Sequence, residues 1–302
     1  MKDLGSLSRV LGIEVRRDRP NGTMPISQGG YIREVLKRYV EVLIPGLVDK
    51  PPEPKPLGAV LLDIGTGVQE SSSRRNANST ECRGMLGSLM YASTGTKLDI
   101  AYAVHQAARR MEDPSREGFS TCKRIFRHFS TVPDLGSTFG DQSNDHCLEE
   151  FVHADWAEHV EDRKSTTRDI FKLNGGATSW CSRKQQLVTW SSTEAKYVAA
   201  GEAGKEMIYL RDLLGSIGFG CRGSTTLYEN NKSAINLSKG SGAHCKTKHI
   251  GVRWHGIREW VRGGILALKY VQTGNQLADI LAKGLSRIKF QRLRILLITA
   301  CW

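Results

Sequence analysis

The C-terminal half of this 302-residue chain predicts an α+β fold. Three short segments rich in apolar residues, at 151–156, 168–173 and 177–182, are separated by polar or glycine-rich turns, which is the pattern of an antiparallel meander. A long helix follows, because the run SSTE at 191–194 carries capping residues and apolar positions then recur at helical spacing. Three consecutive strands before a helix indicate α+β rather than a doubly wound sheet.

The remaining C-terminal elements complete a sheet of five strands. We expect the long helix to end at Gly215, where glycine favours termination. The elements expected after it are a strand at 225–228, a short helix at 232–237, a strand at 265–271 and a final helix at 276–283.

The N-terminal portion is mixed α and β. Residues 7–15 are compatible with a strand, and a helix is expected after the Gly29-Gly30 breaker. Prolines and serines crowd residues 45–80, which predicts a loop or linker. Helical spacing of apolar residues returns within 81–144. The expected domains are therefore 1–44, the linker 45–80, a helical segment 81–144 and a C-terminal domain 145–302.

Charge favours a polyanionic partner. The formal net charge is +12 and the pI is about 9.5, so neutralisation of phosphates with release of counterions would drive binding. A basic surface that is merely solvated is the alternative.

Cysteine usage and hydropathy bear on the compartment. The seven cysteines are scattered singly, which favours a reducing compartment over a disulfide framework. The chain shows neither a signal peptide nor an apolar run long enough for a membrane helix. We expect an intracellular protein, cytoplasmic or nuclear, that is neither secreted nor membrane-inserted.

One cluster of potential zinc ligands stands out, formed by His244, Cys245 and His249. A structural zinc site normally needs four converging nitrogen or sulfur ligands. No second pair of ligands stands out in the sequence, so zinc is the less favoured interpretation.

Several motifs occur in a fixed order along the chain. The C-terminal ones are RKSTT, SWCSRKQ, SSTEAKYVAA, TKHIGVRWHGIREWV, LKYVQT and NQLADILAKGL, and the upstream ones include MKDLGSLSRVLGIEV, LGSLMYASTGTKLDIAYAV and KRIFRHFSTVPDLG. Together they resemble the end of the Pol polyprotein of copia-type (Ty1/copia) retrotransposons. The upstream motifs resemble the reverse transcriptase beyond its palm, and residues 145–302 resemble the ribonuclease H domain.

The resemblance implies an RNase H-like fold with a five-stranded mixed sheet, preceded by a small mixed α/β remnant of a reverse transcriptase. It also implies cleavage of the RNA strand of RNA/DNA hybrids by two Mg²⁺ (or Mn²⁺) ions, without a small-molecule cofactor. Hydrolysis of a phosphodiester by two metals needs hard carboxylate ligands that converge on both ions. The family supplies them from four acidic positions. The polymerase's Y-x-D-D motif lies upstream of KDLG in the family and is absent from this chain.

Only two of those acids are found by matching motifs. Glu194 of STEA and Asp279 of LADI match the second and fourth positions, whereas His153 and Asn230 stand where the family has aspartates. Loss of two carboxylates should weaken metal binding and cost on the order of a thousandfold in rate.

Two neighbouring acids are possible substitutes. Asp155 lies two residues from His153, on the same face of a strand but displaced by roughly 7 Å. Glu229 should face the side of the sheet opposite to Asn230. Three further departures agree with loss of catalysis: Lys196 replaces an acid after STEA, Leu98 replaces a proline in TKLDI, and Arg168-Asp169 replaces a small-aromatic pair. A buried charge at residue 169 would be costly unless it is paired.

The segment 246–262 predicts a helix with a narrow apolar stripe and a basic side. A basic helix face suits phosphate contacts, although a solvated face is the alternative. His249 could contact a phosphate or assist product release, or be a packed structural histidine. The candidate nucleic-acid-binding residues are Lys248, Arg253, His255, Arg258 and Arg262.

Two functional hypotheses follow from these residues. In the first, the chain is a retrotransposon-derived RNase H-like domain with impaired two-metal hydrolysis. In the second, it is a catalytically inactive module that binds nucleic acid such as RNA/DNA hybrid, or a non-functional relic of a transposon.

Overall fold

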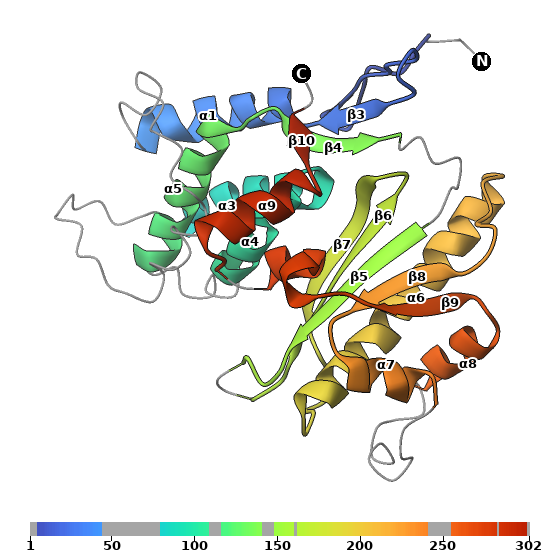
Figure 1. The fold of residues 1–302 in the computed structure, drawn as a ribbon. Helices are drawn as coiled ribbons and strands as arrows, with labels where there is room; N and C mark the ends of the chain where they lie inside the picture. Colours follow the sequence, from blue (N-terminus) through green and yellow to red (C-terminus); the bar gives the residue numbers. More distant parts are fainter. Residues whose placement is uncertain are drawn as a thin grey trace. The chain divides into compact units, whose positions relative to one another are not determined.

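The computed structural model describes residues 5–43, 79–108, 116–140, 148–159, 162–240, 255–282 and 284–300 (Figure 1). The chain divides into two compact units, one formed by Met1–Thr138 with Lys283–Trp302 and the other by Phe139–Ala282. The linker expected at 45–80 lies outside the described residues up to residue 78.

The second unit is built on a five-stranded mixed sheet, as the sequence predicts. Its strand order is β7-β6-β5-β8-β9. The β5–β6 and β6–β7 pairs are antiparallel, and the β5–β8 and β8–β9 pairs are parallel. The strands are β5 (Leu148–Asp155), β6 (Thr166–Leu173), β7 (Gly176–Lys184), β8 (Thr225–Glu229) and β9 (Leu266–Tyr270).

A tight turn joins β6 to β7. Asn174 and Gly175 both have positive φ angles, of 47° and 82°, which is the conformation of a two-residue hairpin loop that matches the twist of its strands. Asparagine and glycine tolerate this conformation better than other residues. The predicted turn between these strands is confirmed.

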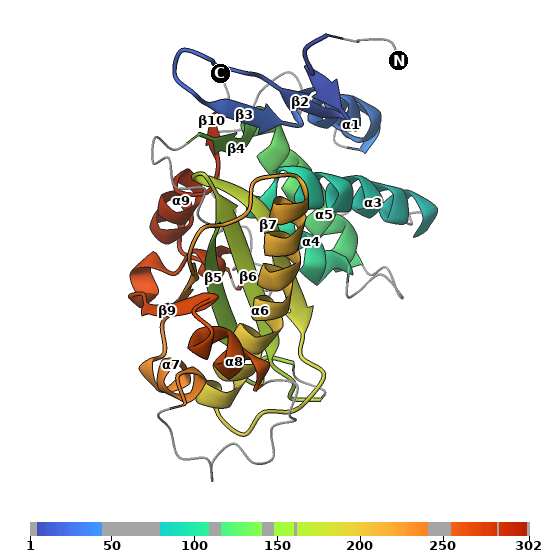
Figure 2. The same cartoon turned by 90° about the vertical axis from the view of Figure 1, so that its right-hand side faces the viewer.

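Helix α6 (Ser192–Ser216) covers the sheet along β5, β6 and β8 (Figure 2). Its N-cap is Ser191, whose hydroxyl accepts a hydrogen bond from the Glu194 amide, as the capping residues predict. The buried face of α6 consists largely of alanines and other small residues that let the helix approach the strands closely. Apolar residues of β5, β6, β8 and β9 complete this core, including Val152, Phe171 and Leu227.

Close packing at Gly204 of α6 yields a stability prediction. A Cβ atom at this residue would lie 2.4 Å from Cζ3 of Trp260, which is much closer than a van der Waals contact between carbon atoms. At Gly215 of the same helix, nothing lies within 4 Å of a Cβ atom. We expect Gly204→Ala to lower the free energy of unfolding by about 1–3 kcal/mol through overpacking, and Gly215→Ala to raise it by about 0.5–1 kcal/mol. Urea denaturation measures both, and equal effects of the two substitutions would contradict the packing argument.

Short helical elements complete the second unit. These are α7 (Lys232–Ser238), α8 (Gly256–Arg262), and the 3-10 turns η4 (Thr273–Asn275) and η5 (Leu277–Leu281). The helix expected at 276–283 is thus a 3-10 turn, with the Gln276 side chain accepting a hydrogen bond from Ala278 N at its start. Gln276 Nε2 also donates to the carbonyls of Val152 and Tyr228, so η5 is tied to β5 and β8.

The first unit combines a small sheet with helices. The sheet order is β1-β2-β3-β4-β10. The strands are β1 (Arg9–Val10), β2 (Ile13–Val15), β3 (Met24–Ser27), β4 (Leu135–Phe139) and β10 (Thr299–Ala300). The helices are α1 (Gly29–Leu43), α3 (Ser79–Gly95), the 3-10 turn η1 (Leu98–Ile100), α4 (Ala101–Ala108), α5 (Arg116–Thr131) and α9 (Arg287–Ile295).

Two segments of the first unit differ from expectation. The run 7–15 holds two strands, because Leu11 and Gly12 turn the chain with φ angles of 48° and 71°. Residues 283–302, expected in the C-terminal domain, belong to the first unit, because Phe290 and Leu293 of α9 are buried and β10 pairs with β4. In the described part of the chain, no helix is long and apolar enough to cross a membrane.

Candidate functional site

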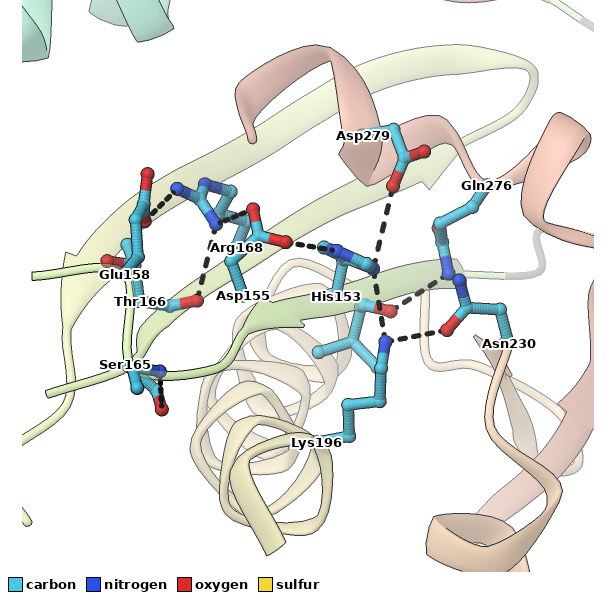
Figure 3. Close-up of polar contacts among 12 residues, drawn as sticks. His153, Asp155, Glu158, Ser165, Thr166, Arg168, Lys196, Asn230, Gln276 and Asp279 are labelled. Carbon is cyan, nitrogen blue, oxygen red and sulfur yellow. Dashed lines mark hydrogen bonds and ion pairs between the residues drawn. The ribbon is translucent and has the colours of Figure 1, made fainter. Parts of the chain in front are cut away.

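Three of the residues singled out in the sequence converge in the second unit. His153 projects from β5, Asn230 directly follows β8, and Asp279 lies in η5. The Nδ1 atom of His153 is 3.5 Å from Oδ1 of Asp279. Figure 3 shows Asp279 and Asn230 on the side of the His153 ring that faces away from Asp155. His153 and Asp279 are almost fully buried.

Lys196 of α6 joins these residues. Its Nζ atom donates to Asn230 Oδ1 at 2.6 Å and to His153 Nδ1 at 3.2 Å, and lies 3.4 Å from Glu229 Oε1. Only 8% of Lys196 is exposed. The ammonium therefore sits among the oxygen and nitrogen atoms of the cluster rather than in solvent (Figure 3).

The Glu194 carboxylate makes a different contact. Its Oε2 accepts a hydrogen bond from the Trp190 amide at 2.8 Å, while the Glu194 amide donates to Ser191 Oγ at 3.2 Å. These two bonds close the N-terminus of α6 as a variant of the capping box, in which the carboxylate accepts from the residue before the N-cap. The α6 side chain bonded to His153 and Asn230 is thus Lys196, two residues beyond the acid that motif matching selected.

Hydrogen bonds assign the protonation of His153. Because an ammonium group can only donate, Nδ1 accepts the hydrogen bond from Lys196 Nζ. The ring proton is therefore on Nε2, which lies 3.2 Å from Asp155 Oδ1. Burial lowers the pKa of His153, and the nearby Lys196 charge lowers it further, although the hydrogen bond to Asp155 opposes both. A neutral imidazole held between Lys196 and Asp155 follows from this arrangement.

Glu229 also takes part, although the alternation of side chains along β8 sets it apart from Asn230. Its carboxylate is fully buried, accepts the Asn231 amide at 2.9 Å and faces Lys196. Burial raises the pKa of Glu229 to about 7, and the Lys196 ammonium limits the rise. Lys196 reaches both residues because its long side chain extends past the end of β8.

Asp155, the possible substitute ligand, is held by a buried arginine. Arg168 Nη1 donates to Asp155 Oδ2 at 2.9 Å and Nη2 donates to Glu158 Oε2 at 2.6 Å (Figure 3). Arg168 is only 1% exposed. The Asp155 carboxylate thus already bonds Arg168 through one oxygen and His153 through the other.

These residues do not fit a pair of divalent cations. Such ions require several converging carboxylate oxygens, whereas Lys196 brings a positive charge to Asn230 and Glu229, and Arg168 brings another to Asp155. Within the described ranges, no group of three or more His, Cys, Asp and Glu side chains is arranged to hold a metal ion.

The candidate nucleic-acid-binding helix is described only in its second half. Lys248, His249 and Arg253 lie outside the described residues, as does the zinc candidate cluster. In α8, Arg262 is exposed. His255 Nδ1 lies 2.7 Å from the Tyr197 hydroxyl.

Arg258 departs from the prediction of a basic outward face. It is 8% exposed, its Cζ lies over the Tyr197 ring at 5.6 Å from the ring centroid, and its Nε donates to the Leu237 carbonyl. Arg258 is a packing residue because these contacts turn its head group into the protein. Arg258 is therefore not on an exposed basic face of α8.

The amino-acid sequence is similar to those of curated proteins. The chain is 36% identical over 292 residues to the Retrovirus-related Pol polyprotein from transposon TNT 1-94 of Nicotiana tabacum, a match that covers 96% of the chain and 21% of the relative. It is 35% identical over 291 residues to the Pol polyprotein from transposon RE1 of Arabidopsis thaliana, covering 96% of the chain and 19% of the relative. The chain belongs to the copia-type retrotransposon Pol polyproteins.

The copia-type chain spans about a fifth of the length of these relatives. No protein-family model matches it. Among solved structures, it is similar to the N-terminal RNase H domain of rv2228c from Mycobacterium tuberculosis, with 8% identity, a TM-score of 0.30, and coverage of 49% of this chain and 96% of that one.

The feature that motif matching missed in this copia-type chain is the role of Lys196. The sequence signal was present, because Lys196 replaces an acid just after STEA. Two acids two residues apart on a helix project in directions about 200° apart, so only one of them can face the sheet. The packing of α6 decides that it is residue 196.

Proposed function

We propose that this chain is an RNase H-like domain that binds nucleic acid, including RNA/DNA hybrid, and does not carry out two-metal hydrolysis. The observation that carries the proposal is the Lys196 ammonium bonded to His153 and Asn230. With residue 196 as the second acid position, three of the four acids of the family are replaced and only Asp279 remains. An internal cation at this place repels Mg²⁺, and it already bonds His153 Nδ1, Glu229 Oε1 and Asn230 Oδ1.

Binding of nucleic acid is supported by charge. The net charge of +12 suits a polyanion, and the electrostatic part of such binding requires no metal. Arg262 is the exposed cation of α8 that remains suited to phosphate contact. A relic without function would lack saturable binding, which separates it from the module proposed here.

Cleavage of a labelled RNA strand in an RNA/DNA hybrid, with Mg²⁺ or Mn²⁺, tests the proposal. We expect no metal-dependent cleavage by the natural chain, and recovery of at least about a thousandfold in the triple variant His153→Asp, Lys196→Glu, Asn230→Asp. Adding Asp279→Asn to that variant should abolish the gain. If the natural chain cleaves the hybrid and Asp279→Asn abolishes this cleavage, the proposal is overturned.

A binding titration without metal completes the test. We expect saturable binding of a blunt RNA/DNA hybrid in EDTA, weakening steeply as salt rises. Calorimetry should detect Mn²⁺ binding by the triple variant but not by the natural chain. If hybrid binding is absent at low salt, the chain is a relic rather than a binding module.

A further inference from the structure

Two tryptophans lie exposed on neighbouring loops at the edge of the candidate site. Trp156 follows the last residue of β5 and is 50% exposed, and Trp190 precedes the N-cap of α6 and is 79% exposed. The indole Nε1 of Trp156 donates to the carbonyl of Thr189 at 2.9 Å, so the Trp156 ring lies beside the peptide that leads into Trp190. We call this pair the tryptophan platform.

Buried polar side chains hold the platform in place. Ser165 Oγ lies 3.0 Å from Thr189 Oγ1 and accepts the Ala157 amide at 3.1 Å, which ties the loop after β5 to the loop before α6. Ser165 is fully buried and Thr189 is 3% exposed. The loops therefore present the two rings on a rigid base.

A second set of bonds anchors the loop before α6. Gln185 is 1% exposed, and its Nε2 donates to Thr167 Oγ1 and to the Ala195 carbonyl. The Trp190 amide donates to Glu194 Oε2. The acid that motif matching assigned to catalysis thus fixes the backbone of an exposed aromatic residue.

The platform is continuous with the candidate site. Asp155, which contacts the His153 ring, directly precedes Trp156, and Glu194 lies two residues before Lys196. Lys164 of the β5–β6 loop and Lys184 at the end of β7 place their ammonium groups 3.8 and 2.9 Å from one Asp162 carboxylate, so positive charge exceeds negative charge among these three side chains. A polyanion at the site would pass along these cations and the two rings.

We infer that the tryptophan platform stacks unpaired nucleobases of a strand that extends beyond the duplex held at the site. Exposed indole rings offer flat surfaces to any base, and each stacked base contributes to affinity without regard to sequence. Bases that are paired and stacked inside a blunt duplex do not offer a free face to these rings. The inference rests on the proposed function, because it names the form of nucleic acid that the domain prefers.

Fluorescence anisotropy with two hybrids tests the platform. One hybrid is blunt, the other carries a single-stranded overhang of six nucleotides at either end, and both are titrated in EDTA at low salt. We expect the natural chain to bind the overhang hybrid about tenfold more tightly, and Trp190→Ala to remove this difference while leaving the affinity for the blunt hybrid unchanged.

Two further variants serve as controls. Trp156→Phe keeps an aromatic face but loses the bond to Thr189, and should reduce the preference for the overhang only in part. Tyr209→Ala removes a 61% exposed aromatic ring farther along α6, about 25 Å from its N-terminus at 1.5 Å per residue, and should change neither affinity.

The outcomes separate the platform from the proposed function. If Trp190→Ala leaves the affinity for the overhang hybrid and the affinity for the blunt hybrid both at the values of the natural chain, the platform alone is overturned. Absence of blunt-hybrid binding together with Trp190-dependent binding of a single strand overturns the proposed function alone. If Trp190→Ala instead dissociates a dimer in sedimentation and leaves both affinities unchanged, the rings form a contact between protein chains and the inference is wrong.

Discussion

Replacing Arg168 with methionine is expected to lower the free energy of unfolding by about 3 kcal/mol or more. Methionine retains most of the length of the side chain but leaves Asp155 and Glu158 without their bonds to the guanidinium, which lie at 2.9 and 2.6 Å. Breaking one side of a buried ion pair costs about 3–5 kcal/mol. The two carboxylates are about one quarter exposed, so water offsets part of that cost.

The matched control is Lys184→Met. Lys184 Nζ lies 2.9 Å from Asp162, but both side chains are more than one third accessible to solvent. Exposed ion pairs contribute less than about 1 kcal/mol, so Lys184→Met should be nearly neutral in urea denaturation at pH 7. A loss from Arg168→Met no larger than that from Lys184→Met would show that the Arg168 cluster does not stabilise the sheet.

The stability of the chain should fall as pH rises from about 4 to about 7, because of two buried acids beneath α6. Asp169 on β6 and Glu150 on β5 are both 0% exposed. Burial raises the pKa of Asp169 to about 7. The Arg183 guanidinium lowers this pKa, and the carboxylates of Glu206 and Glu202 raise it. Burial and the Asp169 charge raise the pKa of Glu150 well above its ordinary value.

The sign follows from proton binding. Between the unfolded and the folded pKa, the folded chain holds a proton that the unfolded chain has lost, so raising the pH favours unfolding. For Asp169 the contribution is fully present below about pH 4 and lost above about pH 7, and a shift of about three units corresponds to roughly 4 kcal/mol. Ionisation of Asp169 and Glu150 would place two negative charges in the core, and the partly exposed Arg183 guanidinium, 3.9 Å from Asp169, would offset one of them in part.

Urea denaturation between pH 5 and pH 8 measures this dependence. Asp169→Asn should flatten the profile by roughly 3 kcal/mol, because an amide carries no charge at either pH. Glu229 has a raised pKa as well and contributes in the same direction, so only the difference between variant and natural chain isolates Asp169. Asp212→Asn, at an exposed residue of α6, should leave the profile unchanged, and a natural chain with a flat profile would contradict the prediction.

Local patterns in the sequence determined the architecture of the second unit. Alternating apolar segments predicted the strands, Asn174-Gly175 predicted the hairpin, and Ser191 with Glu194 predicted the start of α6. These features depend on residues close together in the chain, so they can be recognised without the fold. The linked motifs likewise indicated the copia-type Pol polyproteins, which the relatives confirm.

The content of the candidate site was decided by tertiary packing. His153, Lys196, Asn230 and Asp279 come from four separate segments. The face that α6 buries brings Lys196 rather than Glu194 into this cluster. The same packing turns Arg258 inward and pairs Arg168 with Asp155 and Glu158. A motif identifies which residue types are present, but the direction of a side chain on a helix, and the partner it reaches, depend on the surface against which the helix packs.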